Sequence, residues 1–218
     1  METETPALVS EQYPSDADAW RCDMCDLGKN MKPTYSNSLL LTWQVAEFEA
    51  RRLNAAFIEP AHFLLGLCKC VDIDFPSSIP STIADRDKLL EELLREFQRL
   101  RKVFRTAGLD PTRFRRHYRT LLPEGSPGLN PESARLHRTG SSRDVFANAE
   151  MTAEITGSAV YPIHLLHALM AEGDALMDKA IAAVGTNGKR LLQAIEADLF
   201  GNQRHSSPPR EGDGLKWN

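Results

Sequence analysis

The sequence predicts an all-α fold, built as a tandem pseudo-twofold repeat with an extra helix inserted in the first half. Two observations support this. Residues 43–68 and residues 145–170 align without a gap on Pro60 and Pro162. Each copy also carries apolar residues at steps of three and four, which is the period of one helix face. A long repeat present only twice indicates one domain whose halves bury their apolar faces against each other, rather than a solenoid.

The first copy predicts two helices joined by a short turn. The apolar stripe of the first helix consists of Trp43, Ala46, Ala50 and Leu53. After the turn, Ile58 is expected to point inward. Pro60 then stands in the first turn of the next helix, where proline is tolerated. Residues 61–68 are apolar on nearly all sides, so this second helix should be buried.

The second copy repeats this arrangement. Residues 47–53 align with residues 149–155. Two more short helices are expected at 174–184 and 188–199. Three further pairs of positions correspond between the halves: Ile58 with Val160, His62 with His164, and the glycine stops Gly108 with Gly185. Because the two histidines are placed symmetrically after the prolines, we expect each to make a structural side-chain hydrogen bond in its helix start.

The first half carries an insertion at about residues 72–105. Residues 72–82 are rich in loop-forming residues. Residues 85–105 predict an amphipathic helix whose apolar positions step by three and four, namely Leu89, Leu93, Phe97, Leu100 and Phe104. Two interpretations are open. The insertion is either an elongated core helix or an added partner-binding helix.

These segments resemble the N-terminal domain of the Clp unfoldases. The resemblance is carried by residues 49–53 (EARRL) and 64–67 (LLGL), and by residues 137–139 and 161–166 in the second half. It spans roughly residues 36–200. It implies two four-helix halves, 36–123 and 131–200. Residues 1–35 are then expected to form an extended or disordered arm, and residues 201–218 a disordered tail.

The resemblance implies recognition of proteins rather than catalysis. The chain contains no G-x-x-x-x-G-K-[ST] phosphate loop, so ATP hydrolysis of the unfoldase type is not expected. In one branch of the family, glutamates in the two helix starts help to bind phosphorylated arginine. Here Ala61 and Ile163 stand at those positions, while Glu59 is offset by two residues. The replacements suggest an apolar groove suited to unfolded segments or to a partner helix.

We therefore predict a non-enzymatic adaptor or accessory subunit that binds a Clp ATPase, a Clp peptidase subunit or unfolded substrate segments. The alternative is a free-standing ligand or peptide sensor without a Clp partner. No cofactor is expected. The predicted partner-binding residues lie at the two helix starts and on the inserted helix: Glu59, Ala61, His62, Tyr161, Ile163, His164, Arg95, Arg99 and Lys102. Paired carboxylates such as Glu47 and Glu49 are expected on solvated helix faces.

Composition agrees with a protein partner. The formal net charge of −4 argues against a general affinity for nucleic acid, although residues 95–119 are locally basic. That basic stretch is either a solvated face or a surface for an acidic protein. No signal peptide and no apolar run of about 20 residues is visible, so a cytoplasmic location is expected and no membrane partner.

The four cysteines do not suggest a disulfide scaffold. Cys22 and Cys25 form a C-x-x-C, and Cys68 and Cys70 close the first buried helix. The favoured interpretation is a buried Cys68 with the others as free thiols. A zinc site or a redox pair at Cys22 and Cys25 remains the alternative, because tetrahedral zinc sites use thiolates at such spacings.

Overall fold

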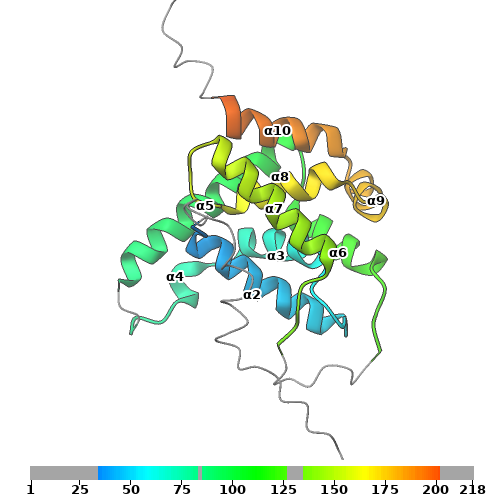
Figure 1. The fold of residues 1–218 in the computed structure, drawn as a ribbon, viewed down its shortest axis with the longest axis horizontal. Helices are drawn as coiled ribbons and strands as arrows, with labels where there is room; N and C mark the ends of the chain where they lie inside the picture. The colour runs from blue at the N-terminus through cyan, green and yellow to red at the C-terminus, as the bar shows by residue number, and fades with distance from the viewer. Residues whose placement is uncertain (1–33, 83–84, 127–134, 202–218) are drawn as a thin grey trace, which may run out of the picture. The chain divides into compact units, whose positions relative to one another are not determined.

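The computed structural model describes residues 34–82, 85–126 and 135–201, and these residues are almost entirely helical, as predicted. Its helices are α2 (Asn37–Arg52), α3 (Pro60–Asp72), α4 (Phe75–Ser78), α5 (Arg86–Ala107), α6 (Pro111–Leu121), α7 (Gly140–Ile155), α8 (Pro162–Glu172), α9 (Ala175–Ala183) and α10 (Gly188–Phe200) (Figure 1). The first-half helices α2, α3, α5 and α6 correspond in order to α7, α8, α9 and α10. This confirms two four-helix halves with an addition in the first.

Each half lends a short extended segment to the other. Tyr35, which precedes α2, forms an isolated parallel bridge with Val160 of the second half. Arg138, which precedes α7, forms the equivalent bridge with Ile58 of the first half. Ile58 and Val160 are fully buried, as the sequence predicted. Tyr35 therefore belongs to the folded repeat and not to the arm predicted for residues 1–35, whose remainder lies almost entirely outside the described residues.

The two halves meet at a cluster of aromatic rings. Trp43 of α2 and Phe146 of α7 hold equivalent places in the repeat, and their ring centroids lie 5.1 Å apart. Phe63 of α3 packs edge-on against both rings. The guanidinium of Arg138 lies 4.3 Å above the centroid of Trp43, and Tyr35 packs edge-on against Phe146. Aromatic and cation–π contacts therefore join the two halves where they meet.

The register of the repeat differs by one residue from the ungapped alignment. α2 is capped by Ser36 and α7 by Thr139, each accepting from a backbone N–H of its own first turn. From these caps, Ala46 and Ala149 occupy equivalent buried positions. The turn after α2 is one residue longer than the turn after α7. An alignment fixed on the prolines therefore shifts the first helix pair, and residues 47–53 do not face 149–155.

The helices α3 and α8 are the most buried parts of their halves, which agrees with their apolar sequences. In α3, Gly66 permits a close crossing with α2, because a Cβ at this position would lie 3.0 Å from the carbonyl oxygen of Thr42. The predicted stops are also present. Gly108 and Gly185 both have positive φ, of 71° and 88°, which glycine adopts without steric cost.

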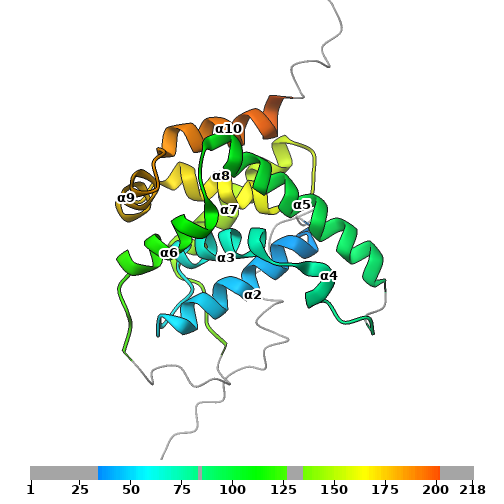
Figure 2. The same cartoon turned by 180° about the vertical axis from the view of Figure 1, so that it is seen from behind.

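The inserted helix is part of the core. α5 buries Leu93, Phe97, Leu100 and Phe104. α5 extends further at its N-terminal end than its counterpart α9. This extension packs against α4, where Phe75 stacks on Phe97 with ring centroids 5.2 Å apart. Figure 2 shows this extension running past the beginning of α2 towards α4. The elongated-core interpretation thus holds, and deleting residues 85–105 would remove core packing.

Candidate functional site

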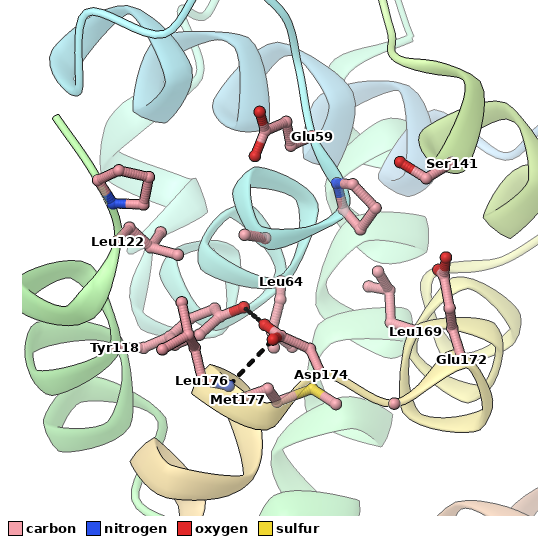
Figure 3. Close-up of a pocket in the computed structure, with 14 residues that line it drawn as sticks. Glu59, Leu64, Tyr118, Leu122, Ser141, Leu169, Glu172, Asp174, Leu176 and Met177 are labelled. Atoms are coloured by element: carbon pink, nitrogen blue, oxygen red, sulfur yellow. Dashed lines mark hydrogen bonds between the residues drawn. The ribbon is translucent and has the colours of Figure 1, made fainter. Parts of the chain in front are cut away.

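A groove opens where the start of α3 meets the second half of the repeat. Its volume is about 340 Å³. Four regions form its walls: the beginning of α3, the end of α6, the beginning of α7, and the junction of α8 with α9 (Figure 3). It is lined by Glu59, Pro60, Ala61, Leu64, Tyr118, Leu122, Pro123, Ser141, Leu169, Glu172, Gly173, Asp174, Leu176 and Met177. The lining comes from both halves, so the repeat has to be assembled for the groove to exist.

The floor of the groove is apolar. Leu64, Leu169 and Met177 are almost completely buried below it. Leu176 stands at the rim and is 36 % exposed, which is unusual for a leucine in this domain. In Figure 3, Leu64 lies between Glu59 on one side and Asp174 on the other. An apolar floor with polar groups at the edge is the common construction of a recognition groove.

The rim of the groove is acidic. Glu59, Glu172 and Asp174 are all exposed. Partial burial raises the pKa of Glu172 above its ordinary value, and the negative charges of Asp144 and Asp174 raise it further. The smaller part of the shift, which comes from Asp144 and Asp174, reflects the repulsion between neighbouring carboxylates. The groove therefore favours a ligand that brings positive charge.

Asp174 has a structural task as well. It accepts hydrogen bonds from the hydroxyl of Tyr118, at 2.7 Å, and from the backbone N–H of Leu176, at 3.0 Å. The second bond caps the start of α9. Burial, followed by the bond to Asp174, raises the pKa of Tyr118 above its usual range. This pair ties α6 to the second half and fixes two walls of the groove to each other.

The two symmetric histidines are helix caps, as expected. The Nδ1 of His62 accepts the backbone N–H of Glu59 at 2.9 Å, and the Nδ1 of His164 accepts that of Tyr161 at 3.0 Å. Both rings are buried, and burial lowers the pKa of each to about 4. Neither ring lines the groove. His62 and His164, which were also predicted to contact a partner, are almost fully buried in this structure, and their hydrogen bonds position the helix starts.

The remaining helix-start residues divide between the halves. Glu59 and Ala61 line the groove, as the partner-binding prediction requires. Ile163, the counterpart of Ala61, is only 1 % exposed and cannot touch a partner in this structure. Tyr161 is half-buried and lies within electrostatic range of Arg95 on α5. The first helix start is therefore open, while the second is covered.

The predicted basic residues of α5 lie outside the groove lining. Arg95 is exposed and pairs with Glu96, with its Nε 3.1 Å from Oε1. Arg99 pairs with Asp198 of α10 at 2.5 Å. Lys102 is exposed. The structure brings none of these three side chains to Glu59 and Ala61, so the predicted residues do not form one continuous site.

A buried charge cluster surrounds Glu49, which the sequence pattern does not predict. Glu49 is fully buried, not solvated as predicted. Its Oε2 accepts hydrogen bonds from the guanidinium of Arg119, with the Nε at 3.1 Å. Lys69 and Arg115 approach its Oε1 at 3.8 and 3.9 Å. These contacts join α2, α3 and α6, and α6 carries Tyr118 of the groove. The only signal in the sequence is that Glu49 follows Ala46 at a spacing of three, on the buried stripe.

The cysteines provide no metal site in the part of the chain that the structure describes. Cys68 and Cys70 are buried and unpaired, and burial raises the pKa of both thiols, that of Cys70 to about 12. Inert thiols of this kind are typical of core packing. Among residues 34–82, 85–126 and 135–201, no group of three or more His, Cys, Asp or Glu side chains could hold a metal ion. Cys22 and Cys25 lie outside these residues.

Comparison with solved structures identifies the fold. The N-terminal domain of Hsp104 from Candida albicans superposes with a TM-score of 0.52 at 16 % identity, covering 80 % of this chain and 93 % of that one. The N-terminal domain of the caseinolytic protease associated chaperone ClpD from Arabidopsis thaliana gives 0.50 at 16 % identity, covering 79 % and 99 %. The chain has the fold of a Clp/Hsp104 N-terminal domain.

A third structure, described as a preliminary investigation of a malarial protein secretion system, gives a TM-score of 0.52 at 16 % identity and covers 77 % of this chain and 95 % of that one. No protein-family model and no curated protein matches the sequence. The Clp N-domain fold is therefore recognised through the structure and through the internal repeat. Within the described residues, no helix combines the length and the apolar character needed to cross a membrane.

Proposed function

We propose that this Clp N-domain-like chain is a non-enzymatic protein-recognition module, and that the groove at the start of α3 binds its partner. The observation that carries the proposal is the groove itself: an apolar floor and an acidic rim, each built from both halves, with an exposed Leu176 from the second half. These properties suit a protein segment with apolar and basic side chains. Both buried histidines are engaged in helix caps, which fits a recognition module.

We further propose that the module serves as an adaptor or accessory subunit of a Clp-type chaperone or protease. Two proteins with this fold bear the names of such machines, Hsp104 and a caseinolytic protease associated chaperone. A groove that accepts a partner segment fits a subunit that presents substrates to such a machine or docks onto it. The competing function, a free-standing peptide sensor, would use the same groove without a Clp partner.

The test is affinity capture from the native host with the full chain as bait, followed by mass spectrometry. Ala61→Trp places a large ring in the groove from a half-buried position on α3. Met151→Trp serves as the control, because Met151 is 61 % exposed on α7 and outside the groove lining. We expect a Clp ATPase or peptidase subunit to be recovered with the wild type and with Met151→Trp, but not with Ala61→Trp.

Two results would contradict the proposal. Equal recovery of the same Clp subunit by all three baits would remove the groove from the interaction. Recovery of partners that depend on Ala61 but include no Clp component would retain protein recognition and replace the adaptor role with the sensor role. Circular dichroism spectra of the three baits establish that each is folded.

A further inference from the structure

The N-terminal half of α5 occupies a position that is empty in the other half of the repeat. In this half and in the turn that follows it, α5 meets four neighbours. Glu92 accepts a hydrogen bond from the backbone N–H of Asn37, at the start of α2, at 2.9 Å. Phe97 stacks on Phe75, just after α3. Arg99, which is already the counterpart of Leu176 in α9, reaches Asp198 near the end of α10. Arg95 lies within electrostatic range of Tyr161, at the start of α8.

The walls of the groove are the repeat counterparts of these four neighbours. The start of α3 corresponds to the start of α8, the end of α6 to the end of α10, and the start of α7 to the start of α2. The junction of α8 with α9 corresponds to the region just after α3. α9 begins only at Ala175, so the second half has no helix in the place that corresponds to the first part of α5. The groove is the space that this shorter helix leaves open.

Burial of equivalent side chains supports this correspondence. Ile163 of α8, the helix against which α5 packs, is 1 % exposed, whereas its counterpart Ala61 is half-buried and lines the groove. Ser38 at the start of α2 is fully buried, whereas Ser141 at the start of α7 is exposed and lines the groove. The starts of α8 and α2 thus show how the starts of α3 and α7 would be buried by a helix lying across them.

From this we infer that the groove binds an amphipathic helix of a partner protein, lying as α5 lies across α8, with a basic side chain directed to Glu59. This inference rests on the proposed function and specifies the partner. The apolar stripe of such a helix would cover Leu64, Leu169 and Met177, as in other recognition modes in which a helix fills a groove. Its basic side chain would take the place of Arg95, since Glu59 is the counterpart of Tyr161.

The charge of the groove explains why the partner helix should be basic at this point. The counterpart of Tyr161 is Glu59, whose side chain is an exposed carboxylate. Glu172 and Asp174 add negative charge on the opposite side of the groove (Figure 3). The partner helix can also carry a carboxylate at the place that corresponds to Glu92. Glu92 accepts a hydrogen bond from the backbone N–H of Asn37, and Gly140 in the first turn of α7 is the counterpart of Asn37. Helix first turns favour negative charge.

The probe for this inference is a peptide with the sequence of residues 86–101, acetylated and amidated at its ends. It carries the apolar stripe and Arg95 of the helix that covers the second helix start. Binding to the full chain is measured by isothermal titration calorimetry at low salt. We expect wild type and Met151→Trp to bind the peptide, and Ala61→Trp to bind it at least about tenfold more weakly, because the ring occupies the space of the helix.

A charge exchange then tests the orientation. Glu59→Arg in the protein should weaken binding of the wild-type peptide about tenfold at low salt, and a peptide with Arg95→Glu should recover it. Glu154→Arg, on an exposed position of α7 outside the groove lining, is the matched control. Peptide binding that is insensitive to Ala61→Trp would overturn the inference. So would no binding of either peptide by a folded protein that still captures its native partner through Ala61, an outcome that leaves the proposed function intact.

Discussion

The two histidine caps predict a specific loss of stability in mild acid. Burial holds the pKa of His62 and of His164 at about 4 in the folded protein, against 6.5 in the unfolded chain. The unfolded state therefore binds more protons, and stability falls as the pH decreases through 6.5 towards 4. At pH 5, linkage between these two pKa values costs about 2 kcal/mol for each histidine, or about 4 kcal/mol for both.

The assay is urea unfolding followed by circular dichroism at pH 7.5 and pH 5. His62→Asn keeps an acceptor near the position of Nδ1 but does not titrate. The two caps together should make the free energy of unfolding about 4 kcal/mol lower at pH 5 than at pH 7.5. His62→Asn should reduce this contribution to about 2 kcal/mol, and the double variant with His164→Asn should remove it. His137→Asn, an exposed histidine that caps no helix, is the control. A His62→Asn protein with the full acid sensitivity of the wild type would refute this reasoning.

Two further predictions concern the core. Glu49→Ala should lower the free energy of unfolding by about 1–3 kcal/mol, because it leaves the partly buried side chains of Lys69, Arg115 and Arg119 without their carboxylate. Adding Arg119→Ala should cost less than the sum of the single changes, and urea titrations of a double-mutant cycle measure both effects. Gly66→Ala should cost about 1–3 kcal/mol, since its Cβ would press on the carbonyl oxygen of Thr42, whereas Gly140→Ala meets no atom within 4 Å and should leave the urea midpoint nearly unchanged. Additive effects of Glu49→Ala and Arg119→Ala would contradict their pairing. Equal urea midpoints for Gly66→Ala and Gly140→Ala would contradict the close helix crossing at Gly66.

Local sequence signals identified most of the fold. Pro60 and Pro162 start helices, and Gly108 and Gly185 end helices. Ile58 and Val160, each two residues before its proline, are buried. Each of these signals is read from a few neighbouring residues, so no tertiary information is needed. The one-residue shift between α2 and α7 could not be predicted, because the turns that follow these helices differ in length. An alignment fixed on prolines after the turns does not determine the register of the helices before them.

The candidate site was predicted less completely, for a different reason. Glu49 looks like any solvated helix glutamate until Arg119, distant in sequence, is seen beside it. The groove floor likewise combines Leu64 with Met177, which no sequence period connects. The symmetry of the repeat predicts Glu59 and Ala61, which line the groove, but it predicts the same role for both helix starts. Only the packing of α5 distinguishes the covered start from the open one.

The exchange of extended segments between the halves has a consequence for synthesis of the chain. Tyr35 pairs with Val160, so the segment that leads into the first helix has no partner until the first part of the second half, up to Val160, has left the ribosome. The first half can form helices earlier, but its edge at Ile58 stays unpaired until Arg138 arrives. Domain completion is thus expected to be a late and concerted event, and a chain cut between the halves should associate through these same edges rather than yield two independent units.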